Sequence, residues 1–394
     1  MICIVGGCGH VGLPLGIVLS KFQEIILFDN NQTNVDIVNN KSMPFFEDGA
    51  AQLLTKAINE KKIIATTDEK ILSKCKTFII TIGTELDSFG NYKVEHFFRL
   101  FDLIKKNNKD QDLTFILRST LFPGCCKTLI KYLNTKFKSF HFSYCPERIL
   151  QGNSIKEISS LPQIISSMNE KSEKKAINIF KKICKQMIYL TFEEAEYVKL
   201  FCNAWRYSAF ALSNQIFSSC LSHGINSKNV FNALKNNYPR TAGLPFPGFT
   251  AGPCLLKDTQ TLGNYDNQNL SLFAESVNVN ENMPKTLLDF YKNKQKINFY
   301  RKKILIIGLG FKKNSDDTRG SLTFKLIKLL RLEQASIYVY DPNIKNQDSF
   351  KFNFVTKNKV KDFRLVFMCN NDSDYSKLKF NMKVKIISPW LDWH

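Results

Sequence analysis

The first half of the chain alternates short apolar runs with longer amphipathic stretches. Runs typical of buried strands occupy residues 1–5, 25–28, 77–83, 113–119, 142–147, 162–167 and 187–191. Strands that alternate with helical stretches predict a parallel, doubly wound sheet. We therefore expect an N-terminal α/β domain over residues 1–192.

The pattern changes in the middle of the chain. Apolar residues recur at helical spacing from about residue 193 to 221, namely Val198, Phe201, Cys202, Trp205, Ala209 and Leu212. Further helical segments are expected after Leu270 and after Pro284. Because strand signals are scarce, residues 193–295 are predicted to form a helical segment, whose long helix could carry a subunit interface.

A strand-and-turn pattern starts again at Lys303. Residues 303–311 form an apolar run that enters a glycine turn, residues 321–332 suit a helix, and residues 337–341, 363–369 and 384–388 suit strands. We expect a second Rossmann-like domain over residues 296–394, after a lysine-rich linker. The predicted fold is α/β, with two Rossmann-like doubly wound domains joined by a central all-helical segment.

The first apolar run leads into a glycine-rich turn. Gly7, Gly9 and Gly12 have the G-x-G-x-x-G spacing, and the next strand-like run ends in Asp29. In a dinucleotide-binding fold such a turn holds the pyrophosphate at a helix N-terminus, and the acid binds the ribose hydroxyls. Since the acid disfavours a 2′-phosphate, we expect NAD rather than NADP.

A second candidate site surrounds Cys254. The cysteine follows a loop of small residues and precedes Lys257 and Asp258. Glycines let the backbone approach a ligand closely, and a nearby lysine favours the nucleophilic thiolate. The same pattern also suits a turn around a buried cysteine, so these residues alone leave both readings open.

Composition narrows the class of protein. The chain has 394 residues and 11 scattered cysteines without a C-x-x-C pair, so reduced thiols and no structural zinc are expected. The net charge of +20 comes mainly from lysines dispersed along the chain. This distribution argues against nucleic-acid binding but suits the binding of a small polyanionic substrate. No apolar run reaches the roughly 20 residues of a membrane span, and the chain opens on its first strand without a signal peptide. We expect a cytoplasmic protein.

Taken in order, these segments resemble the UDP-glucose/GDP-mannose dehydrogenase family of nucleotide-sugar 6-dehydrogenases almost from end to end. The motifs that carry the resemblance are residues 7–15, Pro44-Phe45-Phe46-Glu47, Ser119-Thr120 with Pro123-Gly124, Cys145-Pro146-Glu147-Arg148, Glu196-Tyr197-Val198-Lys199-Leu200 with Asn203, Arg240, the Cys254 loop, residues 308–313 and Asp317-Thr318-Arg319. The resemblance implies NAD-dependent oxidation of the C6 alcohol of a nucleotide-linked sugar to a carboxylate, with two NAD⁺ per product and no catalytic metal.

The resemblance also assigns catalytic roles. Cys254 would form a thiohemiacetal and then a thioester, because the aldehyde must be held covalently for a second hydride transfer. Lys199 would stabilise the C6 oxygen, and Asn203 would bond the same oxygen or the sugar. Glu147 would be the general base of hydrolysis, and Asp258 would hold water and lysine. Thr120 would lie near the nicotinamide and the reacting carbon.

Binding residues follow from the same motifs. The expected NAD contacts are Gly7, Cys8, Gly9, His10, Val11, Gly12, Asp29, Ile82, Thr84, Ser119, Thr120 and Arg319. The expected substrate contacts are Glu147, Arg148, Ile149, Leu150, Lys199, Asn203, Arg240, Phe246, Pro247, Gly248, Phe249, Thr250, Ala251, Phe311 and Lys312. In the family the counterpart of Arg240 can reach across a dimer interface, so a homodimer is expected.

Several positions depart from the family pattern. Ala251-Gly252-Pro253 replaces the commoner Gly-Gly-Ser or Gly-Gly-His, Glu85 stands where a proline is common, and Gln151 stands where many relatives carry an acid. None of these changes removes a reactive group, but they leave the sugar open. A UDP-sugar is expected as the substrate, and the Lys257-Asp258 pair mildly favours UDP-glucose or GDP-mannose over a UDP-N-acetylhexosamine.

Taken singly, the candidate residues also have plain structural readings. Lys199 suits a solvated helix face, Glu147 a helix cap, Asp258 a surface ion pair with Lys257, and Arg319 a local charge pair. Two other functions stay open on the sequence. One is a two-electron NAD-dependent hydroxyacid-type dehydrogenase, and the other is a catalytically silent nucleotide-sugar-binding protein.

Overall fold

The computed structural model describes residues 1–84, 86, 92–109, 112–250, 252–266, 268–313, 315–344 and 346–390. Its contacts divide the chain into two compact units, Met1–Cys202 and Asn203–His394. The long helix α8 (Phe192–Ser222) begins in the first unit and continues in the second.

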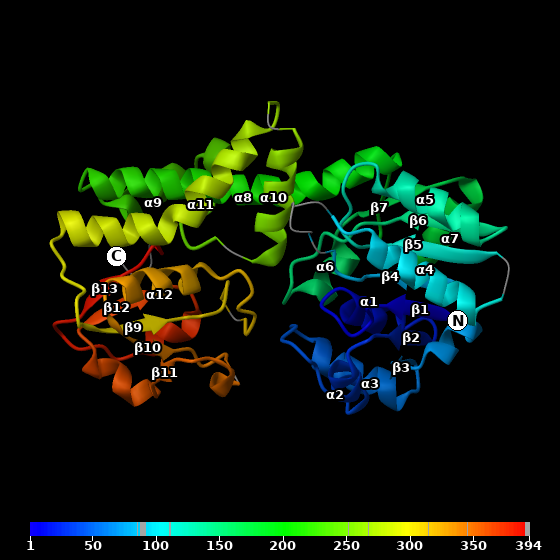
Figure 1. The fold of residues 1–394 in the computed structure, drawn as a ribbon, viewed down its shortest axis with the longest axis horizontal. Coiled ribbons are helices and arrows are strands. Elements are labelled where there is room, and N and C mark those ends of the chain that lie inside the picture. The colour runs from blue at the N-terminus through cyan, green and yellow to red at the C-terminus, as the bar shows by residue number, and fades with distance from the viewer. Residues whose placement is uncertain are drawn as a thin grey trace. The chain divides into compact units, whose positions relative to one another are not determined.

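The first unit is built on an eight-stranded sheet with the order β3-β2-β1-β4-β5-β6-β7-β8 (Figure 1). Its strands are β1 (Ile2–Val5), β2 (Ile25–Phe28), β3 (Ile63–Thr66), β4 (Thr77–Ile80), β5 (Leu113–Leu117), β6 (Phe140–Tyr144), β7 (Gln163–Ser167) and β8 (Met187–Tyr189). The helical segments between them are α1 (Gly12–Leu19), α2 (Gln32–Asn39), α3 (Ala50–Asn59), η1 (Glu69–Lys74), α4 (Glu95–Asn107), α5 (Cys125–Lys136), α6 (Ser154–Ser160) and α7 (Glu170–Phe180).

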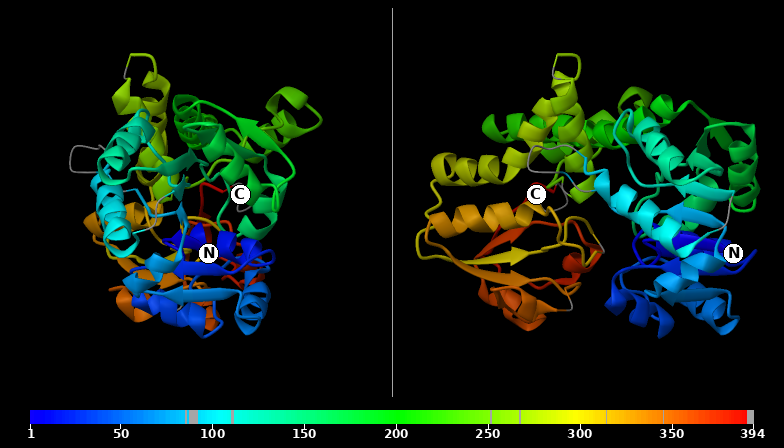
Figure 2. Two further views of the ribbon diagram at one scale, coloured as in Figure 1. Left: turned by 90° about the vertical axis from the view of Figure 1, so that its right-hand side faces the viewer. Right: turned by 45° about the vertical axis from the view of Figure 1, so that its right-hand side comes forward.

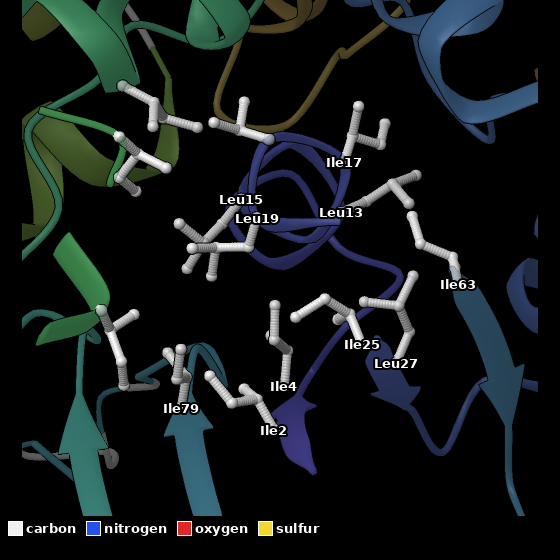
Figure 3. Packing of buried hydrophobic residues seen from close by; sticks show 14 of the residues in the cluster. Ile2, Ile4, Leu13, Leu15, Ile17, Leu19, Ile25, Leu27, Ile63 and Ile79 are labelled. Carbon is white, nitrogen blue, oxygen red and sulfur yellow. The ribbon is translucent and has the colours of Figure 1, made fainter. Parts of the chain in front are cut away.

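Both faces of this sheet are buried, which explains its continuous apolar strands. Ile2 and Ile4 of β1 pack with Leu15 and Leu19 of α1 on one face, as Figure 3 shows. Alternate residues such as Cys3 belong to the core on the other face, with residues of α4 and α5. The order 3-2-1-4-5-6 reverses direction between β1 and β4, and ligands of open α/β sheets bind at the carboxyl ends of the strands beside such a reversal.

The second unit combines helices with a five-stranded parallel sheet of order β11-β10-β9-β12-β13 (Figure 1). Figure 2 shows this sheet, in yellow to red, from two further sides. Besides most of α8, its helical segments are α9 (Ser227–Lys235), η2 (Pro239–Thr241), α10 (Pro253–Tyr265), α11 (Ser271–Asp289), η3 (Phe290–Lys294), α12 (Leu322–Leu332), η4 (Gln347–Ser349), η5 (Lys357–Asp362) and η6 (Ser373–Lys377). Its strands are β9 (Lys303–Ile307), β10 (Ser336–Tyr340), β11 (Asn353–Phe354), β12 (Leu365–Met368) and β13 (Lys385–Ile387). Residues of α11 and α12 share a core with one face of the sheet, and Val360 of η5 and Tyr375 of η6 share a core with the other.

The predicted fold class is confirmed, and three details differ from the expectation. Strand β7 runs antiparallel to β6, because the chain re-enters the sheet at the end where β6 leaves it. Pro284 lies inside α11 instead of separating two helices. Proline removes one helical hydrogen bond, but burial of Met283 and Leu287 holds the helix together across it. The short strands β3 and β11 were not predicted.

Candidate active site

In the first unit, the glycine turn joins β1 to α1 and is sterically closed to larger residues. A Cβ atom on Gly7 would lie 2.7 Å from the carbonyl oxygen of Ile4, and one on Gly12 would lie 2.4 Å from that of Gly6. The N-cap of α1, Val11, makes no side-chain capping bond, and the first turn carries no acid. A turn that only glycine fits, followed by uncapped N–H groups, suits a pyrophosphate, so these residues fit NAD.

Asp29 lies at the end of β2 and braces this turn. Its carboxylate accepts hydrogen bonds from the backbone N–H groups of Cys8 (3.0 Å) and Asn31 (3.0 Å). Burial, together with Asp29, raises the pKa of the Cys8 thiol to about 12. Cys8 is therefore a neutral packing residue of the turn, and its backbone is the part that can face a ligand.

The segments after β4 and β5 bring four of the other predicted cofactor residues to the same edge, namely Ile82, Thr84, Ser119 and Thr120. The Thr81 hydroxyl, just after β4, donates to the carbonyl oxygen of Val5 at 2.8 Å, and the Ser119 hydroxyl, after β5, donates to that of Ile82 at 2.6 Å. Thr84 and Thr120 are half-buried. Since β1, β4, β5 and β6 are consecutive in the sheet, their carboxyl ends form one edge.

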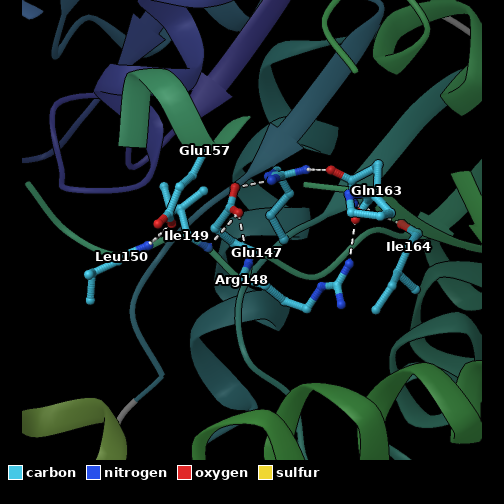
Figure 4. Close-up of polar contacts among 9 residues, drawn as sticks. Glu147, Arg148, Ile149, Leu150, Glu157, Gln163 and Ile164 are labelled. Carbon is cyan, nitrogen blue, oxygen red and sulfur yellow. Dashed lines mark hydrogen bonds and ion pairs between the residues drawn. The ribbon is translucent and has the colours of Figure 1, made fainter. Parts of the chain in front are cut away.

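Glu147 follows β6 on this edge and is almost completely enclosed. It forms an ion pair with Arg118. Its other oxygen accepts from the backbone N–H groups of Arg148 (2.7 Å) and Ile149 (3.0 Å), as Figure 4 shows. The Arg118 side chain is only 2% exposed and also donates to Gln163 at 2.9 Å.

This environment determines the charge of Glu147. Burial alone would raise the pKa of Glu147, but the Arg118 guanidinium and the two N–H groups outweigh it and hold that pKa below its usual range. Glu147 is therefore ionised at neutral pH. A carboxylate of this kind takes up a proton less readily than an ordinary one.

Two buried carboxylates outside the predicted site set the positions of predicted residues. Glu47 accepts hydrogen bonds from the backbone N–H of Gly152 (2.9 Å) and the hydroxyl of Ser154 (2.9 Å), which fixes the segment after Glu147. Glu196 of α8 accepts from the N–H groups of Gly124 (2.7 Å) and Cys126 (2.7 Å) at the start of α5.

Glu196 therefore ties α8 to the segment that follows Thr120. Lys199, less than one helical turn further along α8, is half-buried and not on a fully solvated face. Burial raises the pKa of Glu196, although the Cys126 and Gly124 N–H groups partly offset the effect.

The predicted substrate residues that follow Glu147 differ in exposure. Arg148 and Ile149 are half-buried, and Leu150 is exposed.

In the second unit, Cys254 lies in the first turn of α10 and is exposed. Gly252, the N-cap of this helix, has a φ of 108°, a conformation that favours glycine. A thiolate in the first turn faces the positive end of the helix dipole. The alternative reading of Cys254 as a buried packing residue is therefore not what the structure shows.

Asp258 lies one turn further along α10 and is fully buried. It accepts a hydrogen bond from the side-chain amide of Asn203 at 2.6 Å, and the Lys257 ammonium lies 3.7 Å away. The alternative reading of Asp258 as a surface ion pair is therefore wrong. This pairing fixes α10 to α8 within the second unit.

The predicted sugar loop is mostly buried. Pro247, Gly248, Phe249 and Thr250 are buried, and Phe246 is 44% exposed. The backbone N–H of Gly248 donates to the Asn214 side chain at 2.9 Å. Ala251 lies outside the described residues, as does Glu85.

Three of the other predicted ligand residues lie in the segment between β9 and α12, and Arg240 lies in η2. Phe311 and Lys312 follow β9, and both are half-buried. Arg319 is exposed and pairs with Asp317, with an Nη2-to-Oδ2 distance of 2.7 Å. Arg240 is exposed in η2, with its guanidinium 5.5 Å from the centre of the Tyr238 ring.

The structure thus gathers the predicted NAD residues other than Arg319, with Thr120, Glu147 and Lys199, in the first unit. It gathers Asn203, Cys254, Asp258 and the sugar loop in the second. Within the described ranges, no group of three or more His, Cys, Asp or Glu side chains could hold a metal ion. Nor does any helix there combine the length and apolar character needed to cross a membrane.

Sequence reasoning missed Arg118 and gave no role to Glu47 or Glu196. An available signal was the charged residue that directly follows the apolar run of β5, because a buried arginine needs a carboxylate partner.

Three family models match the chain in order. The UDP-glucose/GDP-mannose dehydrogenase family, NAD binding domain, matches residues 1–184. The central domain of that family matches residues 193–282, and its UDP binding domain matches residues 305–390.

Individual proteins are similar over most of their length. A UDP-N-acetyl-D-mannosamine dehydrogenase from Methanococcus maripaludis is 30% identical over 87% of this chain and 79% of its own. A UDP-glucose 6-dehydrogenase from Rickettsia bellii is 23% identical over 85% of this chain and 80% of its own. The structure of a UDP-glucose dehydrogenase from Pyrobaculum islandicum superposes with a TM-score of 0.88 at 18% identity, covering 99% of this chain and 94% of that one, which supports the fold.

Proposed function

The chain belongs to the UDP-glucose/GDP-mannose dehydrogenase family, and from this premise we propose that it oxidises the C6 alcohol of a UDP-linked hexose to a carboxylate in two NAD-dependent steps. The observation that carries the proposal is Cys254. This exposed thiol lies at the start of α10, directly after a glycine turn and one helical turn before a buried carboxylate.

The chemistry of the proposal balances with two hydride acceptors. NAD⁺, held by the glycine turn of residues 7–12, would supply the hydride acceptor for both oxidations. In the first oxidation the alcohol becomes an aldehyde and its hydroxyl proton passes to solvent, and the Lys199 ammonium offsets the negative charge on the C6 oxygen.

Cys254 supports the second oxidation. Its thiolate adds to the aldehyde carbon, which forms the C–S bond of a thiohemiacetal. Loss of the second hydride gives a thioester at Cys254. Water then breaks the C–S bond, which releases the carboxylate and restores the thiol.

The buried polar residues position these groups. Asp258 and Asn203 fix the relative placement of α10 and α8 within the second unit, so that the first turn of α10 starts from a rigid base. Glu147 remains our candidate for the hydrolytic half-reaction. Because Arg118 lowers its basicity, we assign it the orientation of the attacking water more than the full uptake of its proton.

For the sugar, we propose UDP-N-acetylmannosamine as the first candidate and UDP-glucose as the second. A relative that acts on the first is 30% identical to this chain, whereas one that acts on the second is 23% identical. The Lys257-Asp258 pair mildly favours UDP-glucose or GDP-mannose, so these substrates must be compared with UDP-N-acetylmannosamine.

The test uses purified protein, NAD⁺, and UDP-N-acetylmannosamine, UDP-glucose or GDP-mannose in parallel. We expect NADH and a sugar carboxylate, identified by mass spectrometry, with one of the UDP-sugars. A Cys254→Ser variant should lose formation of the acid. A variant that keeps full turnover would instead indicate a two-electron dehydrogenase, and absence of NADH with tight UDP binding would indicate a silent binding protein.

We also propose a homodimer in the cytoplasm. Two apolar side chains seven residues apart on α8 are strongly exposed, Trp205 at 68% and Leu212 at 53%. Such a stripe on one helix is typical of a surface that is covered by a partner. Sedimentation equilibrium should give twice the chain mass, and a Trp205→Glu variant should sediment as a monomer.

A further inference from the structure

The segment that leads to Cys254 is fixed to α8 on one side. The Ser213 hydroxyl donates to the carbonyl oxygen of Pro245 at 2.6 Å, and the Asn214 side chain accepts from the Gly248 N–H at 2.9 Å. Asn214 in turn donates to Asn280 of α11 at 2.8 Å. All three side chains of this relay are completely buried, so the bonds are shielded from water.

Two aromatic rings from the second sheet contact the same segment. A Cβ atom added to Gly248 would lie 2.3 to 2.6 Å from three ring atoms of Trp390. A Cβ atom added to Gly252 would lie 3.0 Å from two ring atoms of Phe311. The rings therefore lie directly on the two glycines, one shortly before and one just after residues 249–251.

Trp390 follows β13 and is anchored to the sheet. Its backbone N–H donates to the Ser388 hydroxyl at 2.9 Å, and that hydroxyl donates to the carbonyl oxygen of Met368 at 3.1 Å. The indole Nε1 is buried without a hydrogen-bond partner in the described part of the chain. Since no hydrogen bond of the indole orients the ring, Trp390 acts on the segment through its shape.

We propose that Trp390 is a positioning residue for the Cys254 segment. Its ring holds Gly248 against α8, and Phe311 holds Gly252, so that the backbone entering α10 has one conformation. This inference rests on the proposed function for its catalytic consequence, but the packing role stands on the contacts alone. The proposed effect of Trp390 on catalysis passes through this segment and not through direct contact with the reacting atoms.

The first test measures the segment without using activity. Hydrogen exchange of peptides that cover residues 245–252, followed by mass spectrometry, should be faster in Trp390→Ala than in the unmodified protein. Trp390→Phe keeps an aromatic ring and should exchange at close to the original rate. Leu332→Ala, which removes a leucine that is 72% exposed in the same unit, is the matched control.

A second variant reaches the same contact from the other side. Gly248→Ala should disturb the segment because its methyl group meets the Trp390 ring. In the double variant Gly248→Ala/Trp390→Ala the indole ring that meets the added methyl group is gone. Exchange of the segment should then be no faster than in Trp390→Ala alone, a non-additive result expected for residues in contact.

Catalysis provides the final readout. We expect kcat of Trp390→Ala to fall by up to about 100-fold, because small misplacements of reacting groups cost this much, while Trp390→Phe stays near the original value. The proposal is overturned if the segment exchanges at the original rate in Trp390→Ala, or if Trp390→Phe lowers kcat and speeds exchange as much as Trp390→Ala does. If the unmodified protein makes no NADH, the proposed function fails while the exchange experiment still decides the packing role.

Discussion

Replacing Glu147 with glutamine removes the carboxylate charge that faces the buried Arg118 guanidinium. The two side chains are 11% and 2% exposed, and Glu147 also accepts two backbone N–H groups. Glutamine is nearly isosteric, so the substitution changes charge and hydrogen bonding with little change in volume. It leaves a buried cation without its partner.

The magnitude follows from this burial. Breaking one side of a buried ion pair costs about 3–5 kcal/mol, because the remaining charge stays desolvated. For a domain of about 150–250 residues, which includes the unit Met1–Cys202, each kcal/mol lowers Tm by about 2–4 °C. We therefore expect Tm of the transition of this unit to fall by about 6–20 °C.

The assay is differential scanning calorimetry at pH 7, with Glu170→Gln as the control. Glu170 also pairs with a lysine, at 3.9 Å, but its side chain is 90% exposed, so its loss should change stability by less than about 1 kcal/mol.

The pH dependence follows from the lowered pKa of Glu147 in the folded state. The stabilisation from Glu147 is complete above its unfolded pKa of about 4.3 and is lost as pH falls through the lower folded pKa. The difference in Tm between the unmodified protein and Glu147→Gln should therefore narrow below about pH 4. A Glu147→Gln variant that melts with the control would refute this reasoning.

Three further predictions concern the site. Gly12→Ala should abolish NAD binding in calorimetric titration, since its Cβ would lie 2.4 Å from a backbone oxygen, whereas Gly243→Ala, with no atom within 4 Å, should bind normally. Cys254→Ala should remain folded by circular dichroism and yield no sugar acid, because no thioester can form; acid production at the original rate would exclude the covalent route. Asp258→Ala should lower stability by about 1–3 kcal/mol in urea unfolding, because the buried Asn203 amide loses its acceptor, and an unchanged midpoint would contradict that pairing.

The fold could be predicted largely from the sequence because its strands are short, apolar and separated by turn signals. The strands of the first sheet other than β3, together with α8, lie within a few residues of their expected bounds. The predictions that were wrong concern features that depend on tertiary packing. The residues near Pro284 do not indicate that a helix continues through it, because the helix is stabilised there by the apolar core against which α11 packs. The direction of β7 depends on where the chain re-enters the sheet, and hydrophobicity does not encode that.

Candidate site residues could be named from the sequence where a motif has a local mechanism. The glycine turn, Asp29 and Cys254 each stand in a recognisable local frame. Arg118, Glu196 and Trp390 act on partners 29 or more residues away in the sequence, and their roles become visible only when the strands are assembled. The charge that directly follows the β5 run indicates that Arg118 needs a carboxylate partner, but a single sequence does not indicate which one, nor which ring packs on a glycine.

The most direct test of the central claim is the number of NADH molecules formed per nucleotide sugar consumed. The measurement uses purified protein, excess NAD⁺ and a limiting amount of whichever UDP-sugar reacts. A thiohemiacetal and thioester at Cys254 require two NADH for each sugar oxidised to the acid. One NADH per sugar, with an aldehyde or ketone as the product, would contradict the account.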